Sequence, residues 1–193
     1  MATTHRRLAP APPKQIAIQR PRVTFFDLPA EMRIEIYKLA LQNVTIHITP
    51  PSQQEGYKAP HALTLTSRKV RNEVLPMIHS LCPIRCDITE FNFEGLLTWM
   101  ARVPPSEESK LTKNENLTIC FNASSQPPRS LESLRKWLHM RADPHRPQAK
   151  WKYIGPQPSS KVASDLRRRA KRMKEPGKQQ EMLVILKAIG IPS

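Results

Sequence analysis

The sequence feature that most constrains the fold is a series of short segments in which apolar and polar residues alternate. Such segments lie at residues 44–48, 84–88, 117–121 and 151–153, and a period of two is typical of half-buried strands. Longer stretches with apolar residues at helical spacing separate them. Short strands among helices predict an α+β fold, with helices packed on a small mixed or antiparallel sheet.

The clearest helix start lies at Pro29, because proline is favoured at the first helical position and acidic residues stand nearby, where they stabilise a helix N-terminus. The helix predicted over residues 29–41 carries two apolar stripes. We expect one stripe to face the protein core, while the other is either further core or a docking face for a partner helix. The first stripe is Met32, Ile36, Leu39 and Ala40, and the second is Ile34, Tyr37 and Leu41.

Further helices are predicted towards the C-terminus. An amphipathic helix over residues 61–80 should end or kink at Pro76, and another should begin with Ser130 as its cap. A basic helix is expected to begin after Ser159 or Ser160 and to run to Lys174. A Pro-Gly break precedes a final apolar helix over residues 181–189, stopped by Gly190. We expect that helix to pack on the sheet or on the helix at 130–141, because five large apolar side chains need a surface.

Two segments resemble a known family when they are considered together. Residues 26–41 contain Leu-Pro-Ala-Glu-Met-Arg at positions 28–33, and residues 62–76 contain Arg-Lys-Val-Arg-Asn-Glu at positions 68–73. This pair resembles the fungal F-box-like domains, which begin with a leucine-proline-x-glutamate helix and continue with an arginine-x-x-arginine-x-glutamate helix. The triplet Glu31-Met32-Arg33 is also similar to the glutamate-x-arginine signature of related domains.

The resemblance implies a helical module that binds the Skp-type adaptor of a cullin-RING ubiquitin ligase, while the rest of the chain selects a target. It also implies which residues would contact the partner. These are Leu28 and Pro29 from the opening motif, Ile36 from the first helix, and Leu63 and Val70 from the second.

Positive charge is concentrated outside this module. The first 22 residues hold five Lys and Arg and no acidic residue, and residues 129–193 hold 16 basic against five acidic residues. One run is typical of a nuclear import signal or a polyanion-binding patch, although a solvated helix face is a third interpretation. Its cations are Arg167, Arg168, Arg169, Lys171, Arg172 and Lys174.

The chain is expected to be a binding protein rather than an enzyme. It lacks the common nucleophile, phosphate-binding and dinucleotide-binding motifs, so no catalytic residue and no cofactor are expected. No metal site is expected either, because His79, Cys82 and Cys86 supply only three ligands. The absence of a long apolar run argues against a membrane span, and three cysteines suit a reducing compartment. We therefore expect an intracellular monomer located in the nucleus or shared with the cytoplasm.

The domain organisation follows from these patterns. Residues 1–22 are expected to form a disordered basic arm, residues 23–155 an F-box-like α+β domain, and residues 156–193 a basic helix followed by an apolar one. Two functions remain open: a protein-interaction module of F-box-like type, or a nuclear protein associated with nucleic acid through its basic C-terminal region.

Overall fold

A computed structural model describes residues 23–48, 61–122 and 131–192 of the 193-residue chain. Within these residues one sheet contains four strands, and every neighbouring pair is parallel. The strand order along the sheet is the order in the sequence: β1 (Ile46–Ile48), β2 (Ile84–Ile88), β3 (Leu117–Phe121) and β4 (Lys152–Ile154). The predicted arm at 1–22 and the predicted cap Ser130 lie outside the described residues.

The structure confirms helices combined with a small sheet, but the predicted mixed or antiparallel pairing was wrong. At least one helix stands between each strand and the next, and parallel neighbours require a crossover of this kind. The alternation of strand and helical patterns in the sequence therefore favoured a parallel sheet.

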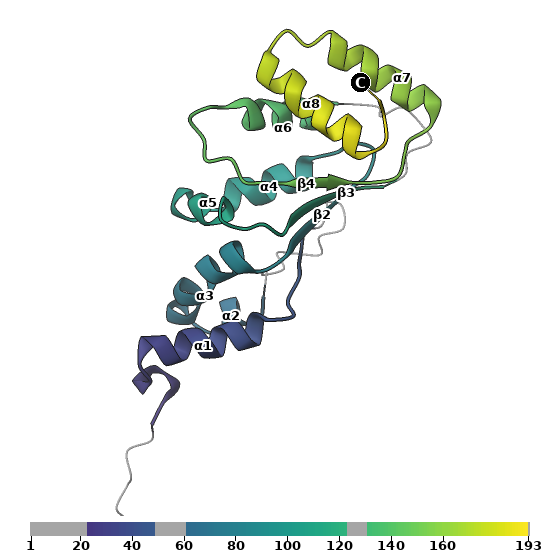
Figure 1. Ribbon diagram of the computed structural model, residues 1–193. Helices are drawn as coiled ribbons and strands as arrows, with labels where there is room; N and C mark the ends of the chain where they lie inside the picture. Colours follow the sequence, from purple (N-terminus) through teal and green to yellow (C-terminus); the bar gives the residue numbers. More distant parts are fainter. Residues whose placement is uncertain (1–22, 49–60, 123–130, 193) are drawn as a thin grey trace, which may run out of the picture.

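Most of the described helices lie in two groups, one at each end of the molecule (Figure 1). At one end are a single 3-10 turn, η1 (Phe25–Asp27), then α1 (Ala30–Leu41), α2 (Leu63–Thr66) and α3 (Arg68–Leu81). At the other end α6 (Glu132–Ala142) lies with α7 (Ser160–Lys171) and α8 (Pro176–Ala188). Between the two groups are α4 (Glu94–Arg102) and α5 (Pro105–Leu111).

The helix predicted over 61–80 is two helices, separated at Ser67. The Ser67 backbone is extended, and its side-chain oxygen accepts a hydrogen bond from the Val70 amide at 3.1 Å, so Ser67 caps α3. Pro76 does not end α3, which continues to Leu81. Val74 and Ile78, on either side of Pro76, are almost fully buried. Their packing offsets the hydrogen bond that proline removes.

Pro176 begins α8 instead of separating it from the preceding helix. It occupies the first turn, where proline loses no intrahelical hydrogen bond, so α8 starts five residues before the predicted position 181. The other end agrees with the prediction. Gly190 has a φ of +74°, and the amides of Gly190 and Ile191 donate to the carbonyls of Lys187 and Leu186. This pattern is a Schellman ending, which places glycine in the left-handed region.

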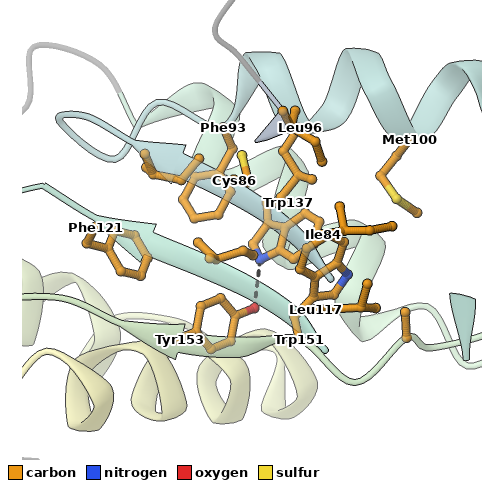
Figure 2. Close-up of a cluster of buried hydrophobic side chains, with 14 of the residues drawn as sticks. Ile84, Cys86, Phe93, Leu96, Met100, Leu117, Phe121, Trp137, Trp151 and Tyr153 are labelled. Atoms are coloured by element: carbon orange, nitrogen blue, oxygen red, sulfur yellow. Dashed lines mark hydrogen bonds between the residues drawn. The ribbon is translucent and has the colours of Figure 1, made fainter. Parts of the chain in front are cut away.

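The core lies on one face of the sheet. Trp137 of α6 stacks on Phe93, with ring centroids 5.5 Å apart, and its Nε1 donates to the Tyr153 hydroxyl on β4 at 2.9 Å (Figure 2). That hydroxyl also contacts the Glu181 carboxylate, which pairs with Arg141 at 2.8 Å. Burial and the nearby Glu181 raise the pKa of Tyr153. These bonds join β4, α6 and α8, and they confirm that α8 packs on α6 and the sheet.

Candidate functional site

The orientation of α1 is fixed by a polar contact with α3. Arg33 donates two hydrogen bonds to the Glu73 carboxylate, at 2.8 and 3.2 Å, and a third to the Leu28 carbonyl at 2.6 Å. The Tyr37 hydroxyl donates to the same carboxylate at 3.0 Å. The hydrogen bonds from Arg33 hold the pKa of Glu73 below its usual value. Both partners are largely shielded from water, so this network ties Arg33 and Tyr37 to α3.

The residues of this network are the ones that carry the family resemblance. Arg33 ends the glutamate-x-arginine triplet, and Glu73 ends the arginine-x-x-arginine-x-glutamate pattern. Arg71 of the same pattern donates from Nε to the Thr64 carbonyl at 2.7 Å, which ties α3 to α2. The charged motif residues therefore hold the three N-terminal helices together.

As a result, α1 turns one apolar stripe away from the core. Met32, Ile36 and Leu39 are 53%, 42% and 71% exposed. In the second stripe Tyr37 and Leu41 are buried, but Ile34 is 41% exposed. Met32, Ile36 and Leu39 follow the i, i+4, i+7 spacing of a single helix face. We call Met32, Ile36 and Leu39 the α1 stripe. The prediction left open which stripe would face solvent. The structure buries Tyr37 and Leu41 of the second stripe beside Arg33, while Ile34 of that stripe stays exposed.

The residues that the resemblance implicated in partner binding differ in accessibility. Pro29 and Ile36 are exposed, while Leu28 and Leu63 are half-buried. Leu63 packs against the hydrophobic core. Val70 is buried, so it supports α3 from inside and is not available to a partner in this conformation. Pro29 and Ile36 are therefore the exposed residues of the implicated set, and Ile36 belongs to the α1 stripe.

The predicted basic run lies mostly on α7, an ordered helix that buries Val162, Ala163, Leu166 and Ala170. Arg168 and Arg169 both pair with Asp165 within the helix, at 2.8 and 2.7 Å, and their hydrogen bonds lower the pKa of Asp165. Arg167 donates to the Pro192 carbonyl at 3.0 Å. In the part of the chain that the structure describes, no carboxylate pairs with Lys171, Arg172 or Lys174.

Part of the run also lines a cavity between α6, α7 and α8. Its volume is about 350 Å³. Arg168, Arg169 and Arg172 lie on its wall with Arg135 from α6, whereas Lys171 and Lys174 do not line it. Some cations of the basic run therefore line the cavity and others lie on the open surface. The sequence of one helix could not predict this, because the cavity also includes residues of α6 and α8.

The second sheet face was not anticipated as a surface. The register aligns His47, Arg85, Thr118 and Lys152 in one row across the four strands. His47, Arg85 and Lys152 are exposed, and Arg85 pairs with Asp87 at 3.2 Å. Parallel sheets are usually covered on both faces. The alternation in the sequence indicated a polar face, but the register decides which polar residues are neighbours across the strands.

The three cysteines of the sequence are free thiols and are buried. Burial raises the pKa of the Cys86 thiol to about 12, so this thiol is protonated at neutral pH and behaves as an apolar side chain. Within residues 23–48, 61–122 and 131–192, no cluster of His, Cys, Asp or Glu has the arrangement of a metal site. The described helices are too short or too polar to cross a bilayer.

Comparisons with protein-family models, with curated proteins and with solved structures found no match for this chain. The function of the chain is therefore inferred from its geometry and from the residue pattern of its first helices.

Proposed function

We propose that this chain is a protein-binding module rather than an enzyme, and that the α1 stripe is its docking surface. One observation carries the proposal. The helix buries Arg33 and Tyr37 and leaves Met32, Ile36 and Leu39 in water. A helix that serves only its own core would bury its apolar side chains. Exposed residues at i, i+4 and i+7 instead match recognition in which a helix inserts its apolar face into a groove of the partner.

The resemblance to F-box-like domains supplies the class of partner. We propose that the stripe binds a Skp-type adaptor of a cullin-RING ubiquitin ligase, and that other surfaces of the molecule recruit the target. Exposure of Pro29 beside the stripe supports this interpretation. Val70 and Leu63 then act by holding α2 and α3 under α1, not by contacting the adaptor. The proposed location is the nucleus or the nucleocytoplasm.

The test is binding of the full chain to a purified Skp-type adaptor, measured by calorimetry. Ile36→Ser with Leu39→Ser should weaken binding by at least about tenfold, because each removes an apolar anchor. The matched control is Leu183→Ser with Val184→Ser on α8, whose side chains are similarly exposed at 37% and 47%. Equal binding by both double variants, or no binding by the wild type, would contradict adaptor docking.

A second candidate is association with nucleic acid in the nucleus through the basic C-terminal region. Exposed Lys171, Arg172 and Lys174, which lack a carboxylate partner among the described residues, favour it. Replacing all three with Ala should weaken binding to duplex DNA and flatten its dependence on salt, since each phosphate contact releases counterions. The same variant, as a fluorescent fusion, tests nuclear accumulation. Binding to the adaptor should change neither with this triple substitution nor with the salt concentration, which separates the two candidates.

A further inference from the structure

The cavity between α6, α7 and α8 has an apolar floor. With a volume of about 350 Å³, it falls within the range of small-molecule sites, roughly 300 to 1,000 Å³. The floor comes from helices far apart in the sequence, and all of its residues except Met173 are buried. They are Leu131, Leu134, Leu138, Met173 and Met182.

The wall of the cavity is basic. Arg135, Arg168, Arg169 and Arg172 line it, with Asp165 as its only acidic lining residue among those the structure describes. Asp165 is already shared by Arg168 and Arg169. No carboxylate in the described chain makes a direct ion pair with Arg135 or Arg172. Glu132, which pairs with Lys136, lies near enough to Arg135 for the two charges to attract.

We infer that this cavity binds a small anionic amphiphile, with a carboxylate or phosphate head at Arg135 and Arg172 and a short apolar body over the floor. The guanidinium fork matches both head groups, because each offers paired oxygen acceptors. An apolar body suits the floor because leucine and methionine side chains offer no polar partner to an ion. The wall charge disfavours a cationic head, and a neutral alcohol would leave both arginines unpaired.

This site is separate from the docking surface of α1, which lies in the other group of helices (Figure 1). It also differs from a nucleic-acid patch. Phosphate contacts along a duplex need exposed cations but no apolar cavity. Arg172 contributes to both surfaces, but Lys171 and Lys174 belong only to the open one.

The test is calorimetric titration of the full chain with octyl phosphate and octanoate, beside octan-1-ol and octylammonium, which share the tail but not the charge. We expect saturable binding of at least one anion, binding of the alcohol at least about tenfold weaker, and none of the ammonium. Failure of both anions to bind, or equal binding of the alcohol, would overturn the inference.

Vesicles containing phosphatidylglycerol distinguish a membrane source of the head group. Binding to vesicles without binding to free octyl phosphate would also overturn the inference.

A charge-matched pair of variants locates the site. Arg135→Gln with Arg172→Gln should weaken anion binding by at least about tenfold, since two charge-assisted contacts are lost. Lys171→Gln with Lys174→Gln removes the same charge from exposed positions outside the cavity and should leave affinity within about twofold. Equal losses in the two variants would mean general attraction to a basic surface. Met173→Trp, which fills the cavity with every charge kept, should also abolish binding, and retained binding would place the ligand elsewhere.

Discussion

The helices α1 and α7 each contain 12 residues, and they present opposite faces to water. In α1 an arginine is buried and four large apolar side chains are exposed; in α7 the apolar residues are buried and the arginines lie outside. The difference follows from where each arginine finds its acid. Glu73 lies on another helix, so Arg33 must turn inward, whereas Asp165 lies on α7 itself and leaves Arg168 and Arg169 at the surface. The position of the counter-charge, not the apolar content, decides which face is free to bind.

The largest expected effect is the difference in unfolding free energy between a leucine-to-alanine substitution in α7 and one in α1. Leu166→Ala in α7 removes a fully buried side chain and should cost about 2 to 5 kcal/mol of unfolding free energy. Leu39→Ala in α1, at a position 71% exposed, should stay within about 0.5 kcal/mol. Urea denaturation measures both. A comparable loss for Leu39→Ala would show that the α1 stripe is covered in solution.

The second effect concerns the contact that orients α1. Arg33→Met should lower the melting temperature by several degrees, because it leaves the Glu73 carboxylate without its cation. Arg168→Met, an exposed arginine of α7, is the control and should change it little. Adding Glu73→Leu to Arg33→Met should restore part of the loss. If the two single variants melt alike, the Arg33 network does not hold α1.

The third effect is a dependence on pH that the same network predicts. Because the pKa of Glu73 is lower in the folded than in the unfolded state, the folded state binds fewer protons there. Its contribution to stability is present above the unfolded pKa, about 4.3, and is lost as the pH falls through the folded value. The difference in melting temperature between the wild type and Glu73→Gln should therefore be widest near neutral pH and narrow below about pH 4. A constant difference would contradict this account.

The smallest effect should come from the acid of α7. Asp165→Asn breaks pairs between residues three and four positions apart whose arginines are largely exposed, so it should cost at most about 1 kcal/mol. Urea denaturation at low and high salt checks this. A loss as large as that of Arg33→Met would mean that Asp165 is more than a surface partner, and the contrast between the helices would then fail.

The sequence predicted the strands and most helices because period two and period 3.6 are local properties. It also predicted that the C-terminal apolar helix would pack on the sheet or on the helix at 130–141, and α8 contacts both β4 and α6. It did not predict that α3 would continue through Pro76 or that α8 would start at Pro176, because neighbours in space decide whether a proline is tolerated. Strand direction was mistaken because alternation was weighed strand by strand, without the helices between.

The candidate surfaces could not be predicted fully from the sequence, because they depend on contacts between residues that are far apart in the chain. Both stripes of α1 were recognised, but the choice between them depends on Glu73, which lies 40 residues beyond Arg33. The cavity combines residues of α6, α7 and α8, so no single helix displays it. The row of His47, Arg85, Thr118 and Lys152 spans four strands and appears only once their parallel register is known.

The strand order carries a consequence for how the chain is made. Each strand pairs only with the strands immediately before and after it in the sequence, so the order of synthesis is also the order across the sheet. As the polypeptide leaves the ribosome, each new strand can join an edge that is already assembled, and no strand must insert between two earlier ones. Folding during synthesis can then proceed by addition from β1 to β4. The helix α8 emerges after β4, and it then packs against β4 and α6 in the hydrophobic core.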